Sequence, residues 1–196
     1  MACKRVARPI KPRELIGEPA LACGCVNGLR FNLIDKIEAL TDERIVAIKQ
    51  VSLAEEYLAD HFPTFPVLPG VMMLEAMTQA AGWVLHRRAK FGKSIAVLKE
   101  ARNVKYGQFV APGELLRVEV EYLKPTDAGA SFKATGFVGG QQSLTARLEI
   151  AYFNLADKQP ELASIDAKLI EHNKTRWSVL TAQGEPAEMA PPALSI

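Results

Sequence analysis

One segment of the sequence, residues 71–90, is apolar on nearly every side of the helix that it predicts. It is rich in Met, Leu, Ala and Gln, contains no proline, and follows Pro69, a residue that suits a helix entry. A helix this apolar has to be buried on most sides, because it offers no continuous polar face to solvent. Only its last turn becomes basic, where positive charge is favourable beside the negative end of the helix dipole. Any fold of this chain must therefore place other elements around this helix.

Segments on both sides of the helix alternate apolar and polar residues in the manner of β-strands. Residues 44–52 alternate before the helix, and residues 31–37 predict a short strand or a turn entry. Four strands are predicted after the helix, at residues 95–106 with a bulge, 115–123, 131–138 and 144–153, with turns at 127–130 and 139–142. One helix can be buried all round by a five-stranded antiparallel sheet only if the sheet curls about it. The sequence therefore predicts an α+β hotdog fold, a curved antiparallel sheet wrapped around one long central helix.

The hotdog domain is expected to span residues 29–154, with a lead-in before it and an extension after it. Prolines and glycines punctuate residues 1–28, which predicts an irregular lead-in. In the extension, residues 155–196, a helix is predicted over 160–177, with Leu162, Ile165 and Leu169 as its apolar stripe. The last residues, 186–196, are expected to be disordered.

Charge, hydropathy and cysteine content favour a cytoplasmic enzyme. The 24 basic and 22 acidic residues nearly cancel, which gives no strong attraction to nucleic acid or membrane. The first residues lack the apolar core of a secretory signal, and no apolar run reaches the roughly 18 residues of a membrane span. Cys3, Cys23 and Cys25 provide too few ligands for a zinc site and are expected to be reduced. The basic residues among the first fourteen predict either a solvated tail or a docking patch for an acidic partner.

The polar residues around the entry of the apolar helix are the candidates for chemistry. Residues 60–70 contain three prolines and predict a constrained loop, with His61 near its start and Gly70 at the helix entry. Glu75 and Gln79 follow on one helical face. A carboxylate in such an apolar helix either has a structural partner or holds a proton near neutrality, which would make it a general acid. An imidazole titrates near neutrality and can act as a general base. From spacing alone, a second interpretation remains open, in which Glu75 is a structural carboxylate and His61 an ordinary loop residue.

The segment HFPTFPVLPGVMMLEAMTQAAG, residues 61–82, resembles the signature of FabZ-type 3-hydroxyacyl-[acyl-carrier-protein] dehydratases. That signature contains His-Phe-Pro, a Pro-Gly-Val step, Glu-Ala and Gln-x-x-Gly, and its fourteen-residue interval is reproduced between His61 and Glu75. Residues 31–37, 44–52 and 104–123 are similar to further family segments, so the resemblance covers roughly 30–154.

The resemblance implies a role for each matching residue. His61 would take the C2 proton of the 3-hydroxyacyl thioester, and Glu75 would protonate the departing 3-hydroxyl to leave a trans-2-enoyl product. The amide of Gly70 would stabilise the charge that develops on the thioester carbonyl, at a helix start that favours anions. The carbonyl of Val67 would orient the imidazole, and Gln79 would steady the acid.

The resemblance also implies partners and an assembly. In this family the His and Glu of one site come from different subunits, so a homodimer is expected, and three dimers often form a hexamer. The substrate arrives on the phosphopantetheine arm of acyl carrier protein, and no cofactor or metal is required. Four residues are expected in the acyl tunnel, each also open to an ordinary packing role: Phe62, Met72, Met73 and Tyr106. Arg102 and Lys105 are candidates for docking the acidic carrier protein.

Some positions depart from the family pattern. Asp60 and Thr64 stand where the family commonly has glycine, and the Arg-Tyr-Pro usual before Phe31 is missing. Both replacements restrict the backbone, and Asp60 puts a carboxylate beside the expected base. Glu75 favours dehydration alone, because the related branch that also isomerises the double bond typically has Asp there. Two alternatives stay open: a hotdog acyl thioesterase, which would share the fold, and a non-catalytic subunit that binds acyl thioesters, to which the Asp60 and Thr64 replacements give weight.

Overall fold

The computed structural model describes residues 32–62 and 64–182. All of the described residues belong to one compact unit. The predicted lead-in, the three cysteines and the expected disorder at 186–196 lie outside the described residues. The helices are α1 (Glu56–His61), α2 (Gly70–Arg88) and α3 (Ala163–Thr181). The strands are β1 (Lys36–Leu40), β2 (Arg44–Gln50), β3 (Ile95–Tyr106), β4 (Leu115–Thr126), β5 (Gly129–Val138) and β6 (Gln141–Phe153).

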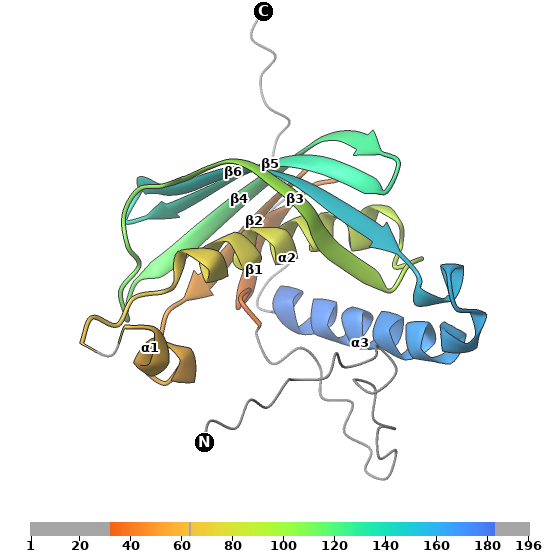
Figure 1. The fold of residues 1–196 in the computed structure, drawn as a ribbon, viewed down its shortest axis with the longest axis horizontal. Helices are drawn as coiled ribbons and strands as arrows, with labels where there is room; N and C mark the ends of the chain where they lie inside the picture. Colours follow the sequence, from red (N-terminus) through yellow and green to blue (C-terminus); the bar gives the residue numbers. More distant parts are fainter. Residues whose placement is uncertain (1–31, 63, 183–196) are drawn as a thin grey trace, which may run out of the picture. The chain divides into compact units, whose positions relative to one another are not determined.

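The six strands form one antiparallel sheet in the order β1-β2-β4-β5-β6-β3, and this sheet curves over α2 (Figure 1). Eleven residues of α2 are buried, all of them between Met73 and His86. The predicted hotdog fold is therefore confirmed, with one more strand than expected. β1 begins five residues later than the predicted segment, because residues 32–35 run irregularly before the strand starts at Lys36. None of the helices in the described part of the chain is long and apolar enough to cross a membrane.

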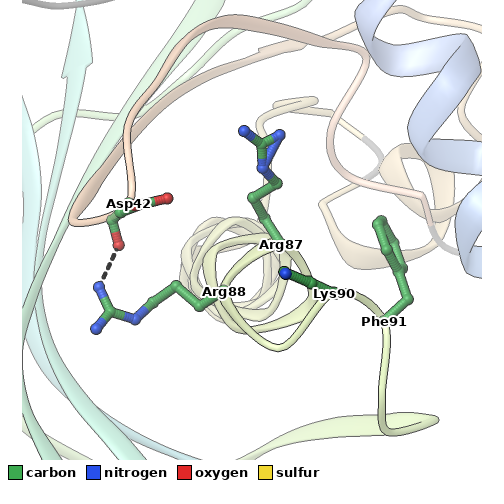
Figure 2. Close-up of a pocket in the computed structure, with 5 residues that line it drawn as sticks. All are labelled: Asp42, Arg87, Arg88, Lys90 and Phe91. Carbon is green, nitrogen blue, oxygen red and sulfur yellow. Dashed lines mark hydrogen bonds between the residues drawn. The ribbon is translucent and has the colours of Figure 1, made fainter.

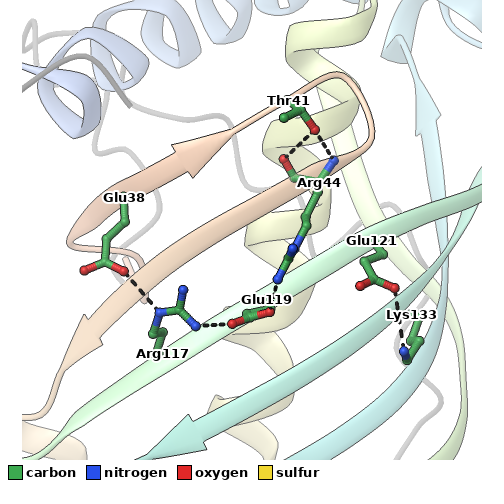
Figure 3. A network of polar contacts seen from close by, with 7 residues as sticks. All are labelled: Glu38, Thr41, Arg44, Arg117, Glu119, Glu121 and Lys133. Atoms are coloured by element: carbon green, nitrogen blue, oxygen red, sulfur yellow. Dashed lines mark hydrogen bonds and ion pairs between the residues drawn. The ribbon is translucent and has the colours of Figure 1, made fainter. Parts of the chain in front are cut away.

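The two faces of the sheet differ in chemistry, as the alternation in the strands predicts. In β4 the inward side chains are fully buried against the core: Leu116, Val118 and Val120. The outward side chains of the same strand form ion pairs with neighbouring strands (Figure 3). Glu119 binds both Arg44 of β2 and Arg117, and Arg117 Nε also donates to Glu38 Oε2 of β1 at 3.2 Å. One face therefore serves the core, and the other is suited to solvent.

α1 extends further along the chain than predicted. A helical turn was expected over 54–58, but the helix continues to His61, so the predicted loop starts two residues later than expected. Phe62 ends the helix with φ −136° and ψ 84°, because a residue that precedes proline is driven out of the α conformation. The loop then joins the rest of the fold through the amide of Leu68, which donates to the carbonyl of Val110 at 2.8 Å.

α3 follows two short 3₁₀ turns, Leu155–Asp157 and Pro160–Leu162. It begins three residues later and ends four residues later than the helix predicted over 160–177. The predicted apolar stripe is partly wrong, because Ile165 is exposed, whereas Asp166 and Leu180 are the buried residues of α3. These two residues and aromatic contacts hold the helix.

The last turn of α2 carries a buried histidine. His86 is 6% exposed, its Nδ1 lies 3.3 Å from the Tyr152 hydroxyl, and its ring stacks on that of Phe91 with centroids 5.9 Å apart. Burial lowers the pKa of His86 to about 4, although a hydrogen bond with the main chain of Lys93 acts in the opposite direction. His86 is therefore neutral at pH 7.

Stability should fall when the pH drops below 7. The imidazole of the unfolded chain takes up a proton near 6.5, whereas that of the folded chain stays neutral until about 4, so protons favour the unfolded state across this window. The contribution of His86 to the free energy of unfolding is expected to shrink by about 3 kcal/mol between these pH values. Urea denaturation of wild type, His86→Gln and, as the control, His172→Gln measures it. Equal pH slopes for wild type and His86→Gln would contradict the assignment.

Candidate active site

The predicted base and acid lie on two helices, with the start of α2 between them in sequence. His61 is the exposed last residue of α1, and its ring centroid lies 4.2 Å from that of Phe62. Glu75 is half-buried in the second turn of α2, a helix that begins at Gly70. The first amides of a helix have no partner within it; in α2 the Met72 amide donates to the Pro69 carbonyl at 2.8 Å, which leaves those of Gly70 and Val71 as the amides that can bind an anion. In the part of the chain that the structure describes, no hydrogen bond joins His61 to Glu75.

Glu75 is held by its neighbour on the same helical face. Gln79 Nε2 donates to Glu75 Oε1 at 3.0 Å, and Gln79 Oε1 accepts a hydrogen bond from the amide of Leu33, also at 3.0 Å. The pairing of Glu75 and Gln79 is the one that the resemblance implies. The contact from Leu33 was missed, because a main-chain amide leaves no signal in a sequence.

The structure also brings Gly70 and Tyr106 together. A Cβ atom at position 70 would lie only 2.8 Å from Tyr106 Cε1, so the tyrosine ring covers the first residue of α2. A larger residue at position 70 would therefore require the ring to shift. Tyr106 is more than half exposed, which leaves it accessible beside the free amides of the helix start.

The other predicted site residues have different surroundings. Met73 and Val67 are buried, with Met73 in the core, whereas Met72 is half-buried and packs against that core. Phe62 is exposed at the end of α1. Met73 is therefore less accessible than Phe62 and Met72, and the tunnel role of all three stays a prediction.

Several exposed apolar side chains belong to segments adjoining α1 and the start of α2, and we call them the aromatic patch: Phe62, Phe65, Val71, Tyr106 and Phe109. Val71 is 69% exposed and Phe109 is 64% exposed. The rings of Phe65 and Phe109 pack edge to face with centroids 5.5 Å apart, which places two loops side by side. Large apolar side chains exposed together mark a surface that binds another molecule. The sequence did not indicate this patch, because Phe65 and Phe109 have no distinctive spacing.

The two predicted docking residues on β3 differ in whether an acidic side chain neutralises their charge. Arg102 donates to both carboxylate oxygens of Glu100, each at 2.7 Å, so its charge is balanced within the strand. Lys105 is exposed. Of the pair, Lys105 is therefore the better candidate for meeting an acidic partner.

A hollow of about 600 Å³ lies at the opposite end of α2, lined by Asp42, Arg87, Arg88, Lys90 and Phe91 (Figure 2). Arg88 Nη1 donates to the carbonyl of Asp42 at 2.6 Å, and its guanidinium lies 4.1 Å from the centre of the Tyr122 ring. Arg88 is eighteen residues from Gly70, which is roughly 27 Å along the helix. This basic hollow is therefore separate from the predicted site. Within residues 32–62 and 64–182, no three His, Cys, Asp or Glu side chains gather as a metal site would require.

Comparison with known proteins identifies the class. The family profile described as a FabA-like domain matches residues 27–147, and the chain belongs to this family. The 3-hydroxyacyl-[acyl-carrier-protein] dehydratase FabZ of Clostridium perfringens is 34% identical over 121 residues, which are 62% of this chain and 87% of the relative. The enzyme of the same name from Solibacter usitatus is 37% identical over 130 residues, 66% of this chain and 78% of the relative.

A solved structure supports the fold independently. The dehydratase heterocomplex ApeI:P from Xenorhabdus doucetiae superposes with a TM-score of 0.57 and 20% identity, covering 67% of this chain and 90% of that one. At this identity the likeness bears on the hotdog fold alone. The family match ends at residue 147, so α3 lies beyond it.

Replacing Gly70 with alanine should destabilise the protein by about 1 kcal/mol, because the new methyl group meets the Tyr106 ring and outweighs the gain in helix propensity. The loss should disappear when Tyr106 is also alanine, since the ring is what the methyl group meets. Urea denaturation of wild type, the two single variants and the double variant gives the coupling energy. Additive effects would mean that the ring does not rest on Gly70.

Proposed function

We propose that this chain dehydrates 3-hydroxyacyl-[acyl-carrier-protein] to trans-2-enoyl-[acyl-carrier-protein] in fatty acid or related lipid biosynthesis. It is a hydro-lyase of the FabZ type. The observation that carries the proposal is the His61–Glu75 motif in a member of the FabA-like family, with the Glu75 carboxyl group held by Gln79 near the start of α2. Relatives at 34% and 37% identity, which are named as FabZ dehydratases of this reaction, support the proposal.

The proposed reaction is a β-elimination in which two side chains move protons. His61 removes the C2 proton, and the electrons of the C–H bond form the C2–C3 double bond as the C3–O bond breaks. Glu75 gives its proton to the departing hydroxyl, which leaves as water. The amide of Gly70 stabilises the negative charge that develops on the thioester oxygen, aided by the dipole of α2. The carbonyl of Val67 holds the imidazole, and solvent returns a proton from His61 to Glu75.

A homodimer is proposed as the catalytic unit, and three dimers as its further assembly. Two features support pairing of copies. The aromatic patch adjoins α1 and the start of α2, where another chain would cover it. β3 is a twelve-residue edge strand that pairs with β6 on one side only, so its other side can pair with a second copy. Such a pair would set His61 of one copy against Glu75 of the other.

Acyl carrier protein is the proposed partner, and its phosphopantetheine arm brings the substrate without any further cofactor. Lys105, and less strongly Arg102, would bind the acidic carrier protein through their positive charges. The acyl chain would be bordered by the four predicted tunnel residues, Phe62, Met72, Met73 and Tyr106. The cytoplasm is the proposed compartment.

His61→Ala and Glu75→Gln should each lower kcat by at least about 100-fold, because each removes one of the two proton-transfer groups. Enoyl absorbance with 3-hydroxyacyl thioesters on carrier protein measures turnover, and His172→Ala is the matched control. Turnover that survives both changes would refute the mechanism. Release of free thiol without enoyl formation, detected with a thiol reagent, would indicate a thioesterase instead.

Mixing the two inactive variants should restore activity if each site combines two subunits. A dimer of one His61→Ala and one Glu75→Gln chain contains one intact site and one doubly altered site. Random mixing in equal amounts after dissociation should give roughly a quarter of wild-type activity, because half of the dimers are mixed and each has one working site. Sites formed within one chain would give no recovery, which would contradict the shared site.

A further inference from the structure

One face of α2 bears the acid and two residues that follow it at intervals of four: Glu75, Gln79 and Trp83. Residues at this spacing lie above one another on a helix, about 6 Å apart along the axis. The residues that the sheet covers are others, among them Met77, Ala80 and Val84, which have no exposed surface. The face from Glu75 to Trp83 is covered instead by the segment before β1 and by α3, which contact Gln79 and Trp83 respectively.

The segment before β1 fixes the orientation of the Gln79 amide. A main-chain N–H can only donate, so the atom that faces Leu33 must be the oxygen of Gln79. The amide nitrogen of Gln79 therefore points at Glu75 Oε1 and occupies that oxygen as an acceptor. The proton of the general acid is then left to Oε2. If the amide of Gln79 were reversed, its oxygen would face Glu75 Oε1, and the two oxygens of Glu75 would no longer differ in this way.

That segment is firmly seated in the fold. Leu33 and Ile34 are buried, and Asp35 both donates its amide to the Ile48 carbonyl at 2.8 Å and accepts the amide of Gln50 at 2.7 Å. α3 packs against β1, the strand that continues this segment. Arg176 of α3 is half-buried, and burial lowers its pKa while the charge of Asp35 acts in the opposite direction. α3 therefore contacts the strand after the segment, and the charge of Asp35, within the segment, acts on Arg176.

α3 is itself anchored at both ends. Asp166 is 5% exposed and accepts hydrogen bonds from the Ser94 hydroxyl and from the amides of Leu155 and Ala156. Burial alone would raise the pKa of Asp166, but these three bonds outweigh it and the pKa is lowered. Near the other end, the ring of Trp177 packs on that of Trp83 with centroids 5.7 Å apart. The helix is thus fixed to the residue before β3, to the turn after β6 and to α2.

We propose that α3 is a positioning element for the general acid: it holds the segment around Leu33 and the Trp83 end of the helix face, so that Gln79 presents its amide nitrogen to Glu75. The inference rests on the proposed dehydratase function. It gives the extension beyond the family match a part in catalysis without contact with substrate.

The test compares variants of α3 in the full-length protein. Trp177→Ala removes the contact with Trp83, and Arg176→Gln removes the charge on which Asp35 acts while keeping the aromatic packing. Trp177→Phe and the exposed Val179→Ala are the matched controls. Hydrogen exchange at the Leu33 amide is measured by NMR beside that of Val84, whose buried position reports general opening. The kcat, KM and pH profile of dehydration are measured on the same samples.

Both test variants should speed exchange at Leu33 by about tenfold relative to Val84 and lower kcat by about tenfold, while KM stays within about twofold. The loss should fall on kcat rather than on KM, because Gln79 no longer holds Glu75 in one arrangement. The controls should behave as wild type. If Trp177→Ala does not fold, Arg176→Gln decides the question by itself.

Three results would overturn the inference. Unchanged exchange at Leu33 would show that α3 does not hold the segment. Faster exchange with unchanged kcat would show that the segment does not position the acid. Equal acceleration at Leu33 and Val84 would reduce α3 to a general stabiliser. A wild-type chain without dehydration would instead refute the proposed function, and the exchange measurement distinguishes this case because it requires no turnover.

Discussion

The burial of α2 inside the curved sheet is the constraint on which the rest of the structure depends. A helix enclosed in this way has little access to water, so each polar group on it needs a partner from the protein. Glu75 obtains one from Gln79, Gln79 from Leu33, and His86 from Tyr152. The carboxyl group is therefore held in one arrangement by the same enclosure that stabilises the fold. The free amides at the start of the helix are the exception, and the proposed chemistry uses them.

Elements with strong periodicity could be predicted from the sequence. The bounds of β3 were predicted correctly, and α2 differed by one or two residues at its ends, because alternation and an all-round apolar helix are unambiguous patterns. β1 was only partly foreseen, because five residues are too few for a clear alternation. The apolar stripe predicted for α3 was partly wrong, since its main anchor is the carboxylate of Asp166, which periodicity assigns to the solvent side.

The site divides in a similar way. The motif indicated which residues would be involved, and the structure shows that Gly70 meets Tyr106 and that Gln79 holds Glu75. The roles of His61 and Glu75 remain predictions until turnover is measured. The aromatic patch could not be predicted, because whether a phenylalanine faces the core or the surface depends on how loops far apart in sequence are packed.

The contact between Leu33 and Gln79 has a consequence for comparing distant relatives. Because the donor is part of the peptide backbone, any residue except proline at position 33 can make the same bond. Evolutionary drift at that position is then limited by the size of the space that Leu33 fills and not by the orientation of the acid. Two chains could share this hydrogen bond with different residues at position 33, so percentage identity underestimates their structural similarity at this site.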